Sequence, residues 1–104
     1  MQNWKIKKMS EKRINLWLQG INFLLRNYTK GKNPYYCPLC DVALCDGCLW
    51  TIIEGKQCFD LKRDLRLGGD MVEARKYKKW QTARIPMLRH WKRILKAEMA
   101  RRVK

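Results

Sequence analysis

The stretch from residue 10 to residue 28, which reads SEKRINLWLQGINFLLRNY, decides the fold of this chain. Its apolar residues return every three or four positions, which places them on one face of an α-helix. Those residues are Ile14, Trp17, Leu18, Ile21, Leu24, Leu25 and Tyr28. Ser10 stands before the pattern as an N-cap, and Glu11 suits the positive start of a helix. We predict an amphipathic helix over about residues 10–28, in which Gly20 marks a close crossing.

A second amphipathic pattern lies beyond Pro86, and we expect its apolar side to pack on the first helix. Its apolar residues are Leu88, Trp91, Ile94, Leu95 and Met99, and its opposing basic residues are Arg89, Lys92, Arg93, Lys96 and Arg102. Upstream, Asp70 with Glu73 three positions on is close to a capping box. This predicts a helix from Met71 to about Thr82. Pro86 either breaks this helix or stands in the first turn of a second helix.

Five cysteines lie between these patterns with the spacing C-x2-C-x4-C-x2-C-x9-C. A C-x2-C pair places two thiolates on one tight turn, where both reach a metal at about 2.3 Å. Two pairs supply four soft ligands, which is typical of a closed tetrahedral Zn²⁺ site. We therefore predict one structural zinc ion held by four of the five cysteines, namely Cys37, Cys40, Cys45, Cys48 and Cys58.

The spacing leaves two ligand sets open. The simplest set is the two C-x2-C pairs, whereas the rival set includes Cys58 and omits one inner cysteine, most readily Cys45. An iron–sulfur cluster would also use four thiolates, but the spacing matches neither ferredoxin pattern. A reversible redox pair is the remaining alternative, because an odd cysteine count argues against a disulfide framework.

The stretch Tyr36–Asp60 resembles small zinc-finger-like proteins of uncharacterised function that bacteriophages and other mobile elements encode. The likeness lies in Cys37-Pro38-Leu39-Cys40, Cys45-Asp46-Gly47-Cys48-Leu49-Trp50 and Gly55-Lys56-Gln57-Cys58. In those proteins proline commonly follows the second cysteine pair, where this chain has Leu49. The resemblance implies a small, metal-bound, phage-like accessory protein, and it transfers no activity.

The charge balance is strongly basic. Among 104 residues, 24 are Lys or Arg and 9 are Asp or Glu, for a formal net charge of +15. Such a balance points to a polyanionic partner, with nucleic acid first and an anionic membrane or an acidic protein face second. The basic residues concentrate from residue 75 onward, where Glu98 is the one acidic residue. The predicted phosphate contacts are Arg75, Lys76, Lys78, Lys79, Arg84, Arg89, Lys92, Arg93, Lys96, Arg101 and Arg102.

The aromatic residues and the one histidine have separate predictions. Trp17 and Trp91 fall at core positions, whereas Trp4 and Trp80 lie among lysines and are candidates for base stacking. We expect Tyr35-Tyr36 to pack against the zinc site and His90 to be solvated or to contact phosphate. Asp41 and Asp46 suit turns better than catalysis.

Together these patterns predict one mainly α-helical domain. Residues 1–34 form the N-terminal helix and turn, residues 35–67 a Cys-rich zinc-binding insert at one end of the helix pair, and residues 68–104 a basic helical segment. No apolar run reaches 18 residues, so we expect no transmembrane helix. Without a signal-peptide pattern we expect the cytoplasm, or the host cytoplasm for a phage-encoded chain.

No enzyme constellation stands out. A phosphate-binding loop and a zinc-deaminase signature are both missing from the sequence, and a four-thiolate site leaves no open metal position for water. We expect a zinc-stabilised basic accessory protein that binds DNA or RNA mainly through phosphates, with no membrane partner and no small-molecule substrate. The alternative is an interaction module that docks on an acidic surface of a larger nucleic-acid-handling complex.

Overall fold

The computed structural model describes residues 3–32, 34, 37–43 and 47–103. Within these ranges the chain is mainly helical and has no strand, which confirms the mainly α-helical part of the predicted fold class. The elements in order are α1 (Asn3–Lys7), α2 (Glu11–Thr29), α3 (Leu39–Val42), the π-helical turn η2 (Trp50–Glu54), α4 (Cys58–Asp64), α5 (Met71–Ala74) and α6 (Lys78–Arg102). None of these helices is long and apolar enough to cross a membrane.

Helix α2 follows its sequence pattern closely. The Ser10 hydroxyl accepts a hydrogen bond from the backbone N–H of Arg13 at 3.1 Å, which satisfies one of the donors that a helix start leaves open. The predicted stripe is the buried face of the helix, with Trp17 and Ile21 fully buried. Beyond Thr29 the chain turns at Gly31, whose φ of +75° favours glycine. The prediction for this helix is confirmed.

Helix α6 is one continuous element of 25 residues, which corrects two predictions. Pro86 lies inside it at an exposed position and neither ends nor starts a helix. Proline removes one backbone hydrogen bond, and at an exposed position water can satisfy the carbonyl that is left. The predicted helix from Met71 to Thr82 is also wrong. Helix α5 ends at Ala74 and α6 begins at Lys78. Asp70 does cap α5, since its Oδ1 accepts from the N–H of Glu73 at 2.9 Å.

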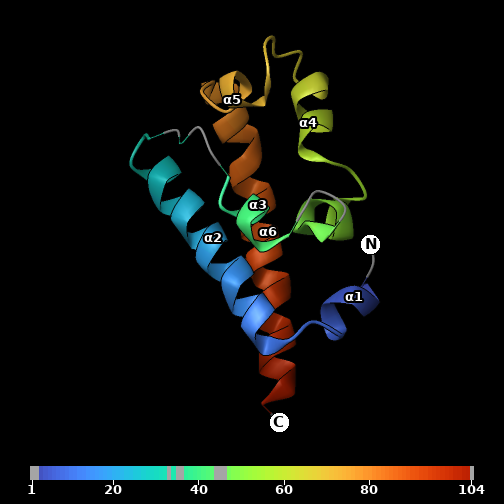
Figure 1. Cartoon of the computed structure of the whole chain (residues 1–104). Coiled ribbons are helices and arrows are strands. Elements are labelled where there is room, and N and C mark those ends of the chain that lie inside the picture. The colour runs from blue at the N-terminus through green and yellow to red at the C-terminus, as the bar shows by residue number, and fades with distance from the viewer. Residues whose placement is uncertain (1–2, 33, 35–36, 44–46, 104) are drawn as a thin grey trace.

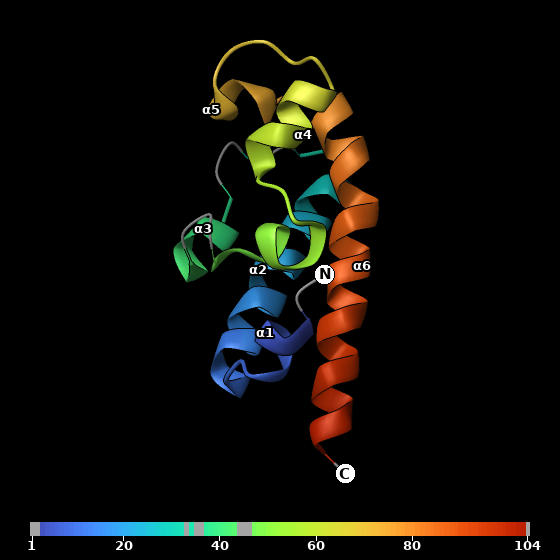
Figure 2. The same cartoon turned by 90° about the vertical axis from the view of Figure 1, so that its right-hand side faces the viewer.

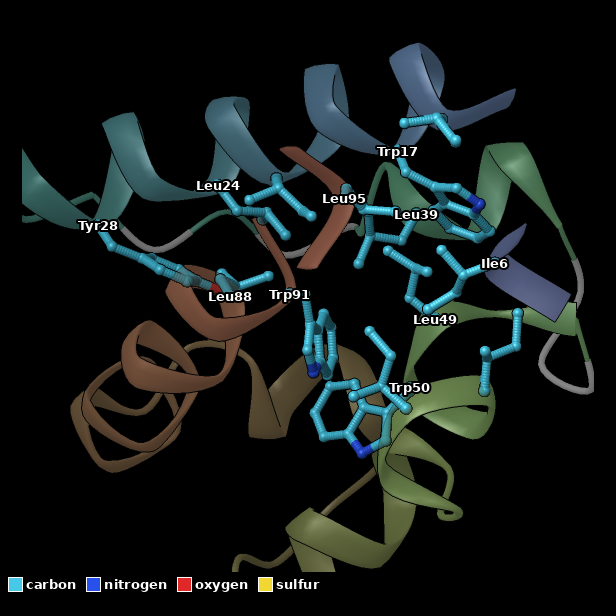
Figure 3. Packing of buried hydrophobic residues seen from close by; sticks show 14 of the residues in the cluster. Ile6, Trp17, Leu24, Tyr28, Leu39, Leu49, Trp50, Leu88, Trp91 and Leu95 are labelled. Carbon is cyan, nitrogen blue, oxygen red and sulfur yellow. The ribbon is translucent and has the colours of Figure 1, made fainter. Parts of the chain in front are cut away.

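Helices α2 and α6 run antiparallel and form the frame of the molecule, as both views show (Figures 1 and 2). Their facing side chains include Trp17 and Leu24 from α2 and Leu88 and Leu95 from α6, all essentially buried (Figure 3). At the far end of α2, Gln81 Nε2 donates a hydrogen bond of 2.6 Å to the Tyr28 carbonyl. The predicted packing of the two amphipathic helices is therefore confirmed.

The middle segment lies only in part at one end of the helix pair, where it was predicted. Helix α4 is beside α5 at the end where α6 begins, whereas α3 and η2 pack into the centre of the pair (Figures 1 and 2). Leu39, Leu49 and Trp50 are buried in the same core as the two long helices (Figure 3). Leu39 lies so close to α2 that a Cβ on Gly20 would stand 2.8 Å from its Cδ2. Gly20 therefore marks the close crossing that its position in α2 predicted. The correction follows from the apolar residues of η2, which need burial of their own.

Candidate metal centre and nucleic-acid interface

Four cysteines from three separate elements line one small cavity. Cys37 and Cys40 bracket the start of α3, Cys48 precedes η2, and Cys58 begins α4. The cavity has a volume of about 20 Å³, which is room for about one water-sized sphere or one ion. Its other lining residues are Ala43, Trp50, Gln57, Arg75 and Arg84. Cys45 lies outside the described residues, so its predicted role as a ligand is not addressed.

The four cysteines are free thiols, and their side chains are not drawn together as metal ligands. Among the described residues, no group of three or more His, Cys, Asp or Glu side chains is arranged to hold a metal ion. Cys37 and Cys40 interact with each other, and this interaction lowers the pKa of Cys37 and raises that of Cys40. Metal binding would have to displace the remaining thiol proton. The residue types still fit zinc, because four cysteines line the same small cavity and thiolates are ligands that structural zinc sites use.

The electrostatics of the cavity favour a thiolate at Cys37. The hydrogen bond from Cys40 and the nearby charge of Arg84 lower the pKa of Cys37 to about 5, although burial opposes the shift. The same hydrogen bond and burial raise the pKa of Cys40. Burial also raises the pKa of Cys48. One of the four sulfurs is therefore ready to act as a nucleophile or metal ligand at neutral pH.

Arg84 lies beside the cysteines although it was predicted to contact phosphate. The side chain exposes 2% of its surface, so the phosphate prediction for this residue is wrong. Its Nη2 donates a hydrogen bond of 3.5 Å to Cys37 Sγ, whereas its Nε is buried with no partner. The guanidinium carbon lies 4.1 Å from the ring centroid of Trp50, which favours the charge by a cation–π interaction.

Tryptophans enclose this arginine. Trp50 stacks on Trp80 at 5.8 Å between centroids and meets Trp91 edge-on at 5.4 Å. Trp91 Nε1 donates a hydrogen bond of 3.0 Å to Glu54 Oε1, which ties η2 to α6. The core predictions for Trp17 and Trp91 are confirmed. The stacking prediction for Trp80 is wrong, because only 1% of its surface is exposed.

The outer surface of α6 is cationic. Lys78, Arg89, Arg93 and Lys96 are exposed, and at about 100° per residue they share an arc of about 60° on this helix. We call these four residues the basic face. The buried residues of α6 lie on the opposite side, with Trp91 at their centre. The basic face thus points away from the core, as the sequence pattern predicted.

The acidic residue of α6 does not interrupt the basic face. Glu98 exposes 7% of its side chain and is bound by Arg101 at 2.6 Å and by Arg102 at 2.8 Å. Hydrogen bonds from Arg101 and then Arg102 lower the pKa of Glu98, so the carboxylate keeps its charge. Arg102 also donates to the carbonyls of Ile6 and Lys7 in α1. Both arginines therefore have structural contacts in addition to their predicted role.

The other predicted phosphate contacts differ in their surroundings. Lys76 is exposed, Lys79 donates a hydrogen bond of 3.4 Å to the Leu65 carbonyl, and Arg75 lines the cysteine cavity. Lys92 lines a groove of about 400 Å³ between α2 and α6 with Arg26 and Lys30. The sequence reasoning missed Arg26 and Lys30. Only the antiparallel packing of α2 on α6 places them beside Lys92.

The remaining predicted residues add little to either site. His90 is exposed on α6 and far along the chain from the cysteines. Cys45, Asp46 and Tyr35-Tyr36 lie outside the described residues, so their predicted roles are not addressed. No protein-family model matches the chain, and neither a curated protein nor a solved structure matches it.

Proposed function

We propose that this chain is a zinc-stabilised basic accessory protein that binds nucleic acid through its phosphates. The observation that carries the proposal is the outward surface of α6. Four cations form the basic face, while Glu98 is turned inward and bound by two arginines. A surface of one charge sign along a rigid helix attracts a polyanion over a distance and releases counterions when it binds.

The groove between α2 and α6 extends this surface. Lys92 lies one step around α6 from the basic face, and Arg26 and Lys30 stand across the groove on the α2 side. A phosphate backbone that follows the basic face would therefore meet further cations from a second element. Contacts of this kind position a nucleic acid without reading its sequence, so we propose binding without sequence specificity.

The proposed metal centre would stabilise the part of the fold that packs against α6. We assign Cys37, Cys40, Cys48 and Cys58 as the ligands, since these four side chains line the cavity. A bound Zn²⁺ would supply the cross-link that joins α3, η2 and α4. Four thiolates and Zn²⁺ have a formal charge of −2, and two cations, Arg84 and Arg75, line the same cavity. Arg84 belongs to α6, so its bond to Cys37 joins the centre to the helix with the basic face.

Salt dependence tests nucleic-acid binding directly. We expect the affinity for a mixed-sequence oligonucleotide to fall steeply between about 50 and 200 mM salt, by fluorescence anisotropy. The variant Arg89→Gln/Arg93→Gln removes two cations of the basic face and should lower the salt slope by about 2. Its matched control is Lys12→Gln/Arg13→Gln, which removes the same charge from the exposed start of α2.

A flat salt response, or equal effects of the two double variants, would overturn the proposed surface. Retention of a protein partner after nuclease treatment would then favour docking on an acidic protein face. The metal assignment has its own test, because elemental analysis should find one zinc per chain in the wild type and in Cys45→Ser. Loss of zinc in Cys45→Ser, with zinc kept in Cys58→Ser, would refute the proposed ligand set.

A further inference from the structure

We infer that α1 is a stacking platform for an unpaired base, so that the nucleic acid bound by this protein is single-stranded. The inference rests on the proposed function and adds the class of strand. Its central residue is Trp4, which exposes 58% of its surface, whereas the other four tryptophans expose 3% or less. An indole that remains on the surface of a chain that buries its other four indoles is available to a ligand.

Cations surround this indole. Lys5 Nζ lies 5.5 Å and Lys8 Nζ 5.8 Å from the centroid of the Trp4 ring. In single-strand binding proteins, aromatic rings stack the bases while neighbouring cations neutralise the backbone. A base that stacks on Trp4 would replace a lysine at the ring face, and the released ammonium would be within reach of the adjoining phosphate.

The platform is fixed to the rest of the molecule. Ile6 is buried in the core at 3% exposure, and Arg102 Nη2 donates to the carbonyls of Ile6 at 3.2 Å and Lys7 at 3.0 Å. Arg102 is itself held in place, because its Nε donates a hydrogen bond of 2.8 Å to Glu98 Oε2. A five-residue helix is unstable alone, so these contacts hold α1, which carries Trp4, against α6.

A separate crevice lies between α1 and α6. It has a volume of about 270 Å³ and is lined by the apolar side chains of Ile6, Ile94 and Ala97 and by the cations Lys7 and Arg101. Glu98 also lines it, with its charge matched by the two arginines that bind it. The crevice can therefore receive the flat face of a second nucleotide and the charge of its phosphate.

An anionic membrane surface is the competing ligand for a tryptophan among lysines. Membrane-surface helices present a continuous apolar stripe to the lipid. In α1 the apolar residue after Trp4 is Ile6, which is already buried in the core. A single exposed ring flanked by cations matches one base better than a lipid layer.

The test compares Trp4→Ala and Trp4→Phe on an oligothymidine strand, a duplex of equal length and vesicles of anionic lipid. We expect Trp4→Ala to weaken strand binding about tenfold, within the 5- to 150-fold that stacking on an aromatic ring contributes. Trp4→Phe keeps a ring and should retain most of the affinity. The affinity of Trp4→Ala for the duplex should fall less than twofold. Leu16→Ala, which removes an exposed apolar side chain from α2, is the control.

Fluorescence gives an independent readout, because Trp4 is the exposed tryptophan. The strand should quench part of the wild-type emission and none of the emission of Trp4→Phe. Binding that persists unchanged in Trp4→Ala, or that weakens equally on strand and duplex, would refute the platform and leave the proposed function standing. Vesicle binding that depends on Trp4 while strand binding does not would also refute it, in favour of lipid. A wild type that binds neither strand nor duplex at low salt would instead refute the proposed function.

Discussion

The α2–α6 pair and the segment from Cys37 to Cys58 share one core but are stabilised in different ways. The pair consists of two long helices whose buried faces meet along their length. Where the structure describes it, outside residues 44–46, the segment has the four-residue helix α3 and the five-residue π-helical turn η2, and neither has a side-chain cap. Short helices do not persist by themselves, so the segment depends on Trp50, on Arg84 and, as we propose, on a metal ion. The periodic apolar faces of α2 and α6 stabilise the helix pair. Contacts of a few side chains, together with the proposed metal ion, stabilise the segment from Cys37 to Cys58.

Metal removal should separate the two regions most clearly. If the zinc proposal is correct, a chelator should raise amide hydrogen exchange in residues 47–58 far more than in α2 or in α6. The expected loss of local stability is several kcal/mol, because the free energy of metal binding is then part of the folding free energy. A chelated protein that keeps residues 47–58 as protected as before would contradict this dependence.

The second-largest effect is expected from a substitution that creates a cavity between α2 and α6. Leu88 is fully buried between the long helices, so Leu88→Ala should lower the free energy of unfolding by about 3 kcal/mol. The exposed Leu16 is the matched control, and Leu16→Ala should change stability by less than about 0.5 kcal/mol. Chemical denaturation measures both. Equal losses would mean that α2 and α6 are not held by this core.

Arg84 joins the two regions, and its removal should cost about 2 kcal/mol. The Arg84→Met variant retains the bulk of the side chain but loses the Trp50 contact at 4.1 Å and the bond to Cys37. Arg89→Met makes the same chemical change at an exposed position of α6 and should be nearly neutral. If thermal unfolding found both variants neutral, the buried guanidinium would have no stabilising role.

The pH dependence of the stability of the metal-free protein tests whether the cavity lowers the pKa of Cys37. Because the folded pKa of Cys37 is lowered to about 5, the folded state releases this proton more readily than the unfolded state does. The resulting stability is fully present above the ordinary thiol pKa and is lost as the pH falls through about 5. Thiolate ultraviolet absorbance should show one titration near this pH that is missing in Cys37→Ser. In Arg84→Met the same titration should move to higher pH.

The smallest expected change is at the crossing of α2 and α3. Gly20→Ala would place a Cβ 2.8 Å from Leu39 Cδ2, and Leu39 is fully buried and cannot move freely. Overpacking of about 1–3 kcal/mol exceeds the gain of about 1 kcal/mol in helix propensity, so we expect a net loss of about 1 kcal/mol. Gly68→Ala, which meets nothing within 4 Å, should be neutral or slightly stabilising by the same denaturation assay.

The same contrast explains which parts of the fold could be predicted. Helix α2 has a cap and an unbroken stripe, so its position was predictable from local pattern alone. Pro86 obscured the continuity of α6, because whether a proline breaks a helix depends on the side it faces. The π-helical turn η2 has no periodic signal, and its apolar residues are buried where α1 packs on it and where Trp80 and Trp91 of α6 contact Trp50.

The candidate site was predictable in part. The C-x2-C spacing predicted Cys37 and Cys40 as candidate ligands, but it could not show that Cys48 and Cys58 line the same cavity as they do. That proximity depends on where η2 and α4 lie. Nor could it distinguish Arg84 from the exposed Arg89, since both are arginines in one basic helix. Burial follows from contacts between residues more than thirty positions apart, which a local pattern does not contain.

The buried guanidinium of Arg84 has one more consequence, for the oxidation state of the protein. Its positive charge is stabilised by the thiolate at Cys37 as well as by the indole rings around it. Joining two of the sulfurs in a disulfide would remove that negative charge and leave the cation buried beside neutral atoms, which is costly in a low-dielectric interior. The arginine therefore biases the cluster toward its reduced form.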